Sequence, residues 1–160
     1  MLATTRQRVF LTFAAGDLVQ ARPVTASLLA GGGLALDQAL TSEPFAGAPG
    51  DIIRASLLAR LRHCQSVLCL YGARTLEDDW VRWALHTAAE LRLPLLGASL
   101  PGEEARDSES GLAQLGVEIV PLDRDAIVVR TRTAASHRPT RTLTAASSAP
   151  TLHLRRHPLR

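Results

Sequence analysis

Lysine is missing from this sequence, and all 18 of its basic residues are arginine. Together with the high content of alanine and leucine, this bias is typical of GC-rich coding and by itself indicates no guanidinium chemistry. Only two cysteines are present, Cys64 and Cys69, which excludes a disulfide-rich scaffold. Because Cys64 flanks an expected buried strand and Cys69 enters it, we expect Cys69 to pack as a small apolar residue and predict neither a disulfide nor a metal site.

Long apolar runs are also missing. No run approaches the roughly 20 residues that a membrane-spanning helix needs. The first residues, Met1 to Arg6, lack the charged-then-apolar order of a signal peptide, since the first apolar run is the strand-length Val9 to Phe13. We therefore expect a cytoplasmic protein without a membrane partner. Its 160 residues suit one domain plus a tail.

Acidic residues are absent from the C-terminal part of the chain. Residues 1–129 hold 11 arginines and all 15 acids, whereas residues 130–160 hold seven arginines and no acid. Residues 131–160 are rich in Ser, Thr, Ala, Pro and Arg and offer too little apolar surface to offset an ordering entropy of about 1–2 kcal/mol per residue. We therefore predict a folded domain over residues 1–130 and a disordered basic tail over residues 131–160. A solvated linker is the simplest interpretation of this tail, and weak binding of nucleic acid or binding of an acidic partner is the alternative.

Within the folded part, strand-like and helix-like segments alternate. The expected strands are 8–13, 34–40, 66–71, 94–100 and 116–121, and the expected helices are 17–30, one capped by Asp51, 80–93 and a turn or two within 123–129. The segments 41–50 and 101–110 are expected to be loops. This alternation predicts an α/β fold of the flavodoxin-like type, with three layers and a parallel five-stranded sheet. In such sheets ligands bind outside the carboxyl ends of the strands.

The most specific segment runs from a buried strand into a helix. The strand is Ser66-Val67-Leu68-Cys69-Leu70-Tyr71, followed by Gly72 and Thr75, and the helix begins at Asp78-Asp79-Trp80-Val81-Arg82-Trp83-Ala84. This corner, together with the opening strand Val9 to Phe13, resembles the Toll/interleukin-1 receptor-like (TIR-like) domain family, in particular its Thoeris anti-phage defence type. The resemblance covers roughly residues 7–129.

The resemblance implies a function as well as a fold. Such domains typically carry Trp-Val-x-x-Glu at this corner, and the glutamate is the catalytic residue of NAD cleavage, which can yield a cyclic ADP-ribose-type messenger. It also implies TIR-like self-association or a defence-system effector as partner. NAD would be a substrate or ligand, and no resident cofactor is expected.

Ala84 occupies the position of the family glutamate. A methyl group can neither hold the nicotinamide ribose hydroxyls nor stabilise the oxocarbenium-like charge of glycosidic cleavage. We therefore expect a degenerate domain that binds a nucleotide or assembles with partners. Two alternatives stay open: an active NAD hydrolase or cyclase that uses a displaced carboxylate from Asp78 or Asp79, and a non-catalytic interaction scaffold. The simplest role of these two aspartates is to cap α-helical N–H groups and complement the helix dipole.

The candidate ligand contacts gather at the expected carboxyl end of the sheet. They are Phe13, Ala14, Asp17, Phe45, Tyr71, Gly72, Trp80, Trp83 and Ala84. The two tryptophans have a competing interpretation, in which their rings pack the helix against the sheet instead of stacking on a base.

Overall fold

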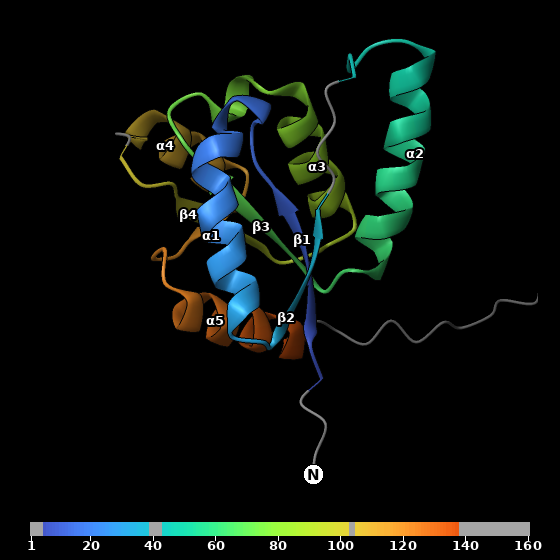
Figure 1. Ribbon diagram of the computed structural model, residues 1–160. Helices are drawn as coiled ribbons and strands as arrows, with labels where there is room; N and C mark the ends of the chain where they lie inside the picture. The colour runs from blue at the N-terminus through green and yellow to red at the C-terminus, as the bar shows by residue number, and fades with distance from the viewer. Residues whose placement is uncertain (1–4, 39–42, 103–104, 138–160) are drawn as a thin grey trace, which may run out of the picture.

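The computed structural model describes residues 5–38, 43–102 and 105–137. These residues form a five-stranded sheet in the order β2-β1-β3-β4-β5, with every neighbouring pair parallel (Figure 1). The strands are β1 (Gln7–Thr12), β2 (Leu34–Gln38), β3 (Ser66–Tyr71), β4 (Leu95–Ser99) and β5 (Glu118–Ile119). The predicted flavodoxin-like α/β fold with a parallel five-stranded sheet is therefore confirmed.

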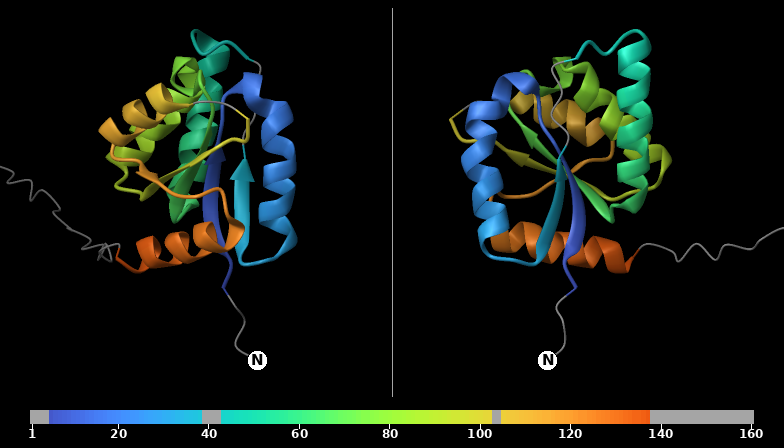
Figure 2. Two further views of the ribbon diagram at one scale, coloured as in Figure 1. Left: turned by 90° about the vertical axis from the view of Figure 1, so that its left-hand side faces the viewer. Right: turned by 45° about the vertical axis from the view of Figure 1, so that its right-hand side comes forward.

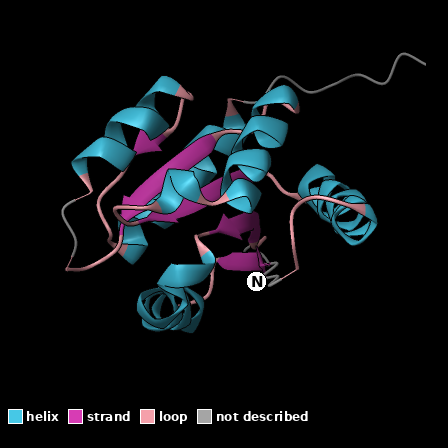
Figure 3. Cartoon of the chain, turned by 90° about the horizontal axis from the view of Figure 1, so that it is seen from above, coloured by secondary structure: helices cyan, strands magenta, loops and turns pink. Residues whose placement is uncertain are grey.

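Helices cover both faces of this sheet (Figures 2 and 3). They are α1 (Leu18–Ala30), α2 (Ala48–His63), α3 (Asp79–Glu90), α4 (Arg106–Gln114) and α5 (Arg124–Ser136), and two 3-10 turns, η1 (Ala15–Asp17) and η2 (Thr75–Glu77), precede α1 and α3. The apolar residues divide into two clusters. One packs α2, α3 and α4 on one face, and the other packs α1 and α5 on the opposite face.

The central strand β3 explains why the sequence folds in this way. All six of its residues are buried, because alternate side chains enter the two clusters: Val67, Cys69 and Tyr71 enter one, and Leu68 and Leu70 enter the other. A strand that is apolar at nearly every position and buried on both faces is stable only between two helical layers. Its pattern therefore requires the three-layer architecture.

The structure corrects several element boundaries. The segment expected to be a charged loop contains α4, and α2 begins at Ala48 with Gly47 as its N-cap, so that Asp51 lies in the first turn. Helix α5 continues to Ser136, and Thr131 is fully buried. The domain boundary expected at residue 130 is therefore too early. The predicted disorder of the rest of the tail, residues 138–160, concerns positions outside the described residues.

Among the described residues, no helix is both long enough and apolar enough to cross a bilayer.

Candidate functional site

The direction in which strands are added to the sheet reverses between β1 and β3. In a flavodoxin-like sheet, the loops that follow these two strands diverge and leave a crevice outside their carboxyl ends. A cavity of about 480 Å³ lies at this place, between the loop after β1 and the loop after β3. Its lining residues are Ala14, Gly16, Asp17, Gln20, Ala73, Arg74, Glu77 and Asp78.

Asp78 connects the two loops that border the cavity. Its Oδ1 accepts hydrogen bonds from the backbone N–H groups of Trp80 at 2.9 Å and Val81 at 3.2 Å, and so caps α3. Its Oδ2 accepts a hydrogen bond from the backbone N–H of Ala15 at 3.1 Å. The interpretation of Asp78 as a helix cap is confirmed, and both of its oxygens already have donors.

Buried hydroxyl groups hold the loop after β3. The Oγ1 of Thr75 accepts a hydrogen bond from the Gly72 N–H at 2.7 Å and donates to the Gly72 carbonyl at 3.2 Å. From α4, the Ser108 hydroxyl donates to the carbonyl of Ala73 at 3.0 Å. Because Thr75 is fully buried and Ser108 is nearly so, Arg74 and Glu77 are carried on a fixed backbone.

The cavity carries more negative than positive charge. Asp17, Glu77 and Asp78 line it together with one cation, Arg74, whose Nε lies 2.7 Å from Oε2 of Glu77. The side chains of Arg74 and Glu77 are 84% and 63% exposed, and an exposed pair of this kind contributes only about 0–1 kcal/mol. Both side chains can therefore turn to a ligand, the carboxylate toward hydroxyl groups and the guanidinium toward phosphate.

Three of the eleven candidate residues from the sequence line this cavity: Ala14, Asp17 and Asp78. Phe13 and Tyr71 are buried in opposite clusters of the core. The Tyr71 hydroxyl donates to Oε2 of Glu109 at 3.2 Å, and burial, reinforced by that carboxylate, raises the pKa of Tyr71 to about 12. The N–H of Gly72 is taken by Thr75.

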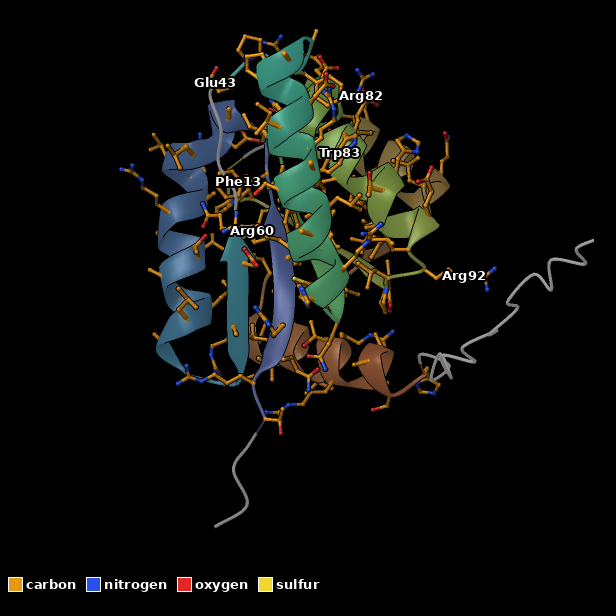
Figure 4. All side chains as sticks on the ribbon, turned by 90° about the vertical axis from the view of Figure 1, so that its right-hand side faces the viewer. Phe13, Glu43, Arg60, Arg82, Trp83 and Arg92 are labelled. Atoms are coloured by element: carbon orange, nitrogen blue, oxygen red, sulfur yellow. The ribbon has the colours of Figure 1, made fainter. Side chains whose placement is uncertain are left out.

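The rings of Phe45, Trp80 and Trp83 form a separate cluster at the same end of the molecule, where Figure 4 shows Trp83 near Arg82. Phe45 and Trp80 meet edge-to-face at 5.0 Å between centroids, and Trp80 and Trp83 do so at 6.5 Å. The Arg54 guanidinium lies 4.4 Å from the centre of the Phe45 ring and donates to the Phe45 carbonyl. The indole N–H of Trp80 donates to the Glu43 carbonyl at 3.0 Å. These contacts pin the segment before α2 to α3, a role that the packing interpretation of the tryptophans does not include. Both tryptophans also pack against the apolar cluster on this face of the sheet, and none of the three rings lines the cavity.

Ala84 is part of the apolar core. It is 3% exposed and belongs to the cluster that packs α2, α3 and α4 against the sheet. Position 84, which the resemblance places in the ligand site, is therefore not among the residues that line the cavity. Asp79, the other candidate carboxylate, lies in the first turn of α3 and pairs with Arg82 across an exposed surface, and it does not line the cavity either.

Sequence reasoning missed five of the lining residues. They are Gly16, Gln20, Ala73, Arg74 and Glu77. All five lie in or next to the loops after β1 and β3, and the rule that ligands bind at the carboxyl ends of strands already points to these loops. Within such loops no periodic pattern marks which side chains face the crevice.

Within the described parts of the chain, no group of three or more His, Cys, Asp or Glu side chains is placed to hold a metal ion. Comparison of the sequence with models of known protein families gave no match, and comparison with curated proteins gave none either.

Proposed function

We propose that this chain is a TIR-like domain that binds an ADP-ribose-type nucleotide such as NAD between the loops after β1 and β3, and that it cleaves NAD slowly or not at all. The observation that carries the proposal is the position of the cavity. It lies at the reversal between β1 and β3, where flavodoxin-like sheets take their ligands.

The charges of the cavity suit one half of NAD in particular. Asp17 and Glu77 can accept hydrogen bonds from ribose hydroxyls, and their charge favours the cationic nicotinamide ring. Arg74, at the same cavity, can leave its exposed pair with Glu77 and bind the diphosphate. The nicotinamide ribose would then lie among the carboxylates, with the diphosphate next to Arg74.

Weak or absent cleavage follows from the carboxylates that the chain offers. Ala84 is buried among apolar side chains and supplies no charge. The carboxylate of Asp78 is engaged by three backbone N–H groups, and a carboxylate that caps a helix is a poor partner for a developing cation. Neither Ala84 nor Asp78 therefore supplies the electrostatic stabilisation that glycosidic cleavage needs.

A second candidate function is an active NAD hydrolase or cyclase with a displaced carboxylate. The specific observation in its favour is Glu77, which lines the cavity and is held only by an exposed arginine. Glu77 is a better candidate for this role than Asp78 or Asp79, because Asp78 is committed to the helix cap and Asp79 does not line the cavity.

The wider role rests on the resemblance of the sequence alone. Anti-phage signalling and association with TIR-like partners or an effector are proposed on that basis. A scaffold with an empty cavity is the remaining alternative.

Titration of the isotopically labelled protein with NAD and with ADP-ribose, followed by amide chemical shifts, tests the binding site. We expect the largest shifts in residues 14–17 and 73–78, and weaker binding in the variants Asp17→Asn and Glu77→Gln. Asp107→Asn, in the first turn of α4, is the matched control because it removes a charge outside the cavity. Shifts confined to Phe45, Trp80 and Trp83 would place the ligand on the aromatic cluster and overturn the proposed site.

Incubation with NAD and chromatography of the products tests the chemistry. We expect release of nicotinamide no faster than in the buffer blank. Turnover that Glu77→Gln abolishes would establish the active enzyme instead. If neither NAD nor ADP-ribose binds, the proposed nucleotide function is wrong and the scaffold interpretation is favoured.

A further inference from the structure

The two ends of the sheet carry opposite charge. Beside the carboxyl ends of the strands the described residues place eight carboxylates: Asp17, Glu43, Asp51, Glu77, Asp78, Asp79, Asp107 and Glu109. Four arginines accompany them: Arg54, Arg74, Arg82 and Arg106. At the amino ends the balance is reversed, with seven arginines, Arg6, Arg8, Arg62, Arg92, Arg124, Arg130 and Arg132, against Glu90, Glu118, Asp123 and Asp125. A coding bias toward arginine does not explain this separation, because it would act equally at both ends.

Five of the amino-end arginines have no ion pair with any other described residue: Arg6, Arg8, Arg62, Arg92 and Arg132. By contrast, three of the four arginines at the carboxyl end are paired with a neighbouring carboxylate. Arg92 follows α3 at the end of that helix opposite to Arg82, and its side chain projects sideways away from the molecule (Figure 4). The uncompensated positive charge of the described domain is therefore concentrated at one end.

Three of these arginines, Arg62, Arg8 and Arg132, lie on neighbouring segments that contact one another. The backbone N–H of Gln65 donates to the Arg8 carbonyl at 2.8 Å, and the Arg8 N–H donates to the side-chain Oε1 of Gln65 at 2.9 Å. These two hydrogen bonds place the end of α2, with Arg62, beside the start of β1. On the other side, the N–H of Gln7 donates to the Gly33 carbonyl at 2.9 Å. The Arg132 guanidinium approaches Gly33, lying 3.4 Å from where a Cβ on that glycine would be. The line from Arg62 through Arg8 to Arg132 thus crosses the sheet from the α2 face to the α5 face.

The described chain also begins and ends at this end of the molecule (Figure 1). The sequence that follows His137 adds five arginines and no acid. The arginines at the amino end and the arginines after His137 carry charge of the same sign, so both attract a negatively charged partner.

No phenylalanine, tyrosine or tryptophan ring is available at this end. The six aromatic residues of the chain are Phe10, Phe13, Phe45, Tyr71, Trp80 and Trp83, and each lies either in the core or in the cluster at the carboxyl end. Proteins that bind single strands use such rings to stack on bases. A surface of arginines without such large rings suits the phosphate backbone of a duplex, whose charge density is higher than that of a single strand.

We propose that the amino end of the sheet, with Arg8, Arg62 and Arg132 at its centre, binds the phosphate backbone of duplex nucleic acid without regard to sequence. This surface is distinct from the cavity at the carboxyl end, and the proposal does not depend on the nucleotide ligand proposed there. It would hold the domain on nucleic acid while leaving the cavity open at the opposite end.

Fluorescence anisotropy of the full chain with a labelled 20-base-pair DNA of arbitrary sequence, at several salt concentrations, tests this proposal. We expect dissociation constants in the range of about 10⁻⁶–10⁻⁴ M, which is typical of non-specific binding. The triple variant Arg8→Gln, Arg62→Gln, Arg132→Gln should weaken binding at least tenfold at low salt. It should also reduce the slope of log K against log salt by about 2–3, because each lost phosphate contact removes about 0.9. The matched control is Arg22→Gln, Arg82→Gln, Arg106→Gln, which removes the same charge elsewhere and should change both quantities little.

Three results would overturn the proposal. The first is no binding at low salt. The second is a combination of two results. The triple variant leaves the slope of log K against log salt unchanged, and replacement of the five arginines after His137 by glutamine abolishes binding. Together they would assign the interaction to the tail alone. The third is that a polyglutamate peptide displaces the labelled DNA at a lower concentration of negative charges than unlabelled DNA needs. An acidic protein would then be the better partner. Circular dichroism of each variant separates loss of binding from loss of fold.

Discussion

The Oδ2 atom of Asp78 and the backbone nitrogen of Ala15 lie 3.1 Å apart, and their hydrogen bond joins segments 63 residues apart in the sequence. The same carboxylate caps α3 through its other oxygen. The loop after β1 is therefore fixed to the first turn of α3 by a single side chain. The shape of the cavity between the two loops depends on this structural carboxylate as much as on the residues that would touch a ligand.

Replacement of Asp78 should accordingly reduce stability. In Asp78→Ala the cap is lost, which costs about 1–2 kcal/mol, and the lost acceptor for Ala15 adds roughly 1 kcal/mol. Asp78→Asn keeps one oxygen for the cap and should cost less than half as much. Urea unfolding followed by circular dichroism gives both values. Asp79→Ala, which breaks only an exposed pair with Arg82, is the control and should change stability by less than about 0.5 kcal/mol.

A contrary outcome for Asp78 would be informative. If Asp78→Asn left the free energy of unfolding unchanged but abolished a measurable NAD turnover, the carboxylate would have a chemical role, and the structural account would be wrong.

Ala84→Glu should destabilise the protein and should not create NAD turnover. The sequence resemblance alone suggests that this change restores a catalytic carboxylate, but the Ala84 methyl lies in the apolar cluster against α2 and the sheet. A carboxylate placed there has no partner, and we expect a loss of roughly 3–5 kcal/mol, comparable to other unpaired buried charges. Ala89→Glu introduces the same side chain on the exposed face of α3 and should be nearly neutral. A stable Ala84→Glu variant that releases nicotinamide from NAD would show that position 84 does reach the ligand.

The sequence was sufficient for the sheet and its central layer, because the strands carry their own signal. Strand β3 is apolar at nearly every position, and this pattern is compatible only with burial on both faces. Helix α4 lacks such a signal. Its sequence, Arg106 to Gln114, is polar and contains a glycine, and it buries only Ser108 and Leu112. Its helical state is supported by contacts with the loop after β3, which no local pattern can reveal.

The candidate site was only partly predictable for a similar reason. The fold class indicates which loops border a ligand, and that indicates Ala14 and Asp17, whereas Asp78 is named as a displaced carboxylate near the family glutamate position. The spacing of Trp80 and Trp83 placed them on neighbouring helical turns but could not show that Phe45 and Arg54 fill the space around them. The tryptophan rings take part in packing because the segment before α2, which is distant in sequence, folds onto them.

Gly50→Ala should disturb that aromatic cluster. A Cβ on Gly50 would overlap the carbonyl oxygen of Phe45 and lie 2.9 Å from its carbonyl carbon, so the backbone of one segment must move. We expect a loss of about 1–3 kcal/mol, as for other overpacked sites, with a change in tryptophan fluorescence because Phe45 contacts Trp80. Gly16→Ala is the matched control, since nothing lies within 4 Å of its Cβ position. Equal stability of the two variants would contradict the close approach at Gly50.

Stability should fall as the pH rises above about 9, and the absence of lysine makes this effect easy to attribute. Burial raises the pKa of Cys64 to about 11 and that of Cys69 to about 12, and burial with the Glu109 carboxylate raises the pKa of Tyr71 to about 12. In the unfolded chain a thiol loses its proton near pH 8.5 and a tyrosine near pH 10. Between these values and the folded pKa values, the folded state holds protons that the unfolded state has released. The free energy of unfolding therefore decreases with pH in this range, by up to about 1.4 kcal/mol per pH unit for each ionising group.

Urea unfolding at several pH values from 8 to 11 measures this slope directly. With no lysine, one tyrosine and two cysteines in the chain, few other side chains titrate in this range. Cys69→Ala and Cys64→Ala should each make the decrease between pH 9 and 11 shallower, whatever their effect on stability at pH 8, because each removes one thiol that the folded state keeps protonated. His86→Gln, on the exposed face of α3, is the control and should leave the slope unchanged. A free energy of unfolding that stays constant from pH 8 to 11 in the natural chain would show that the two thiols are not shielded from solvent as their burial in the structure requires.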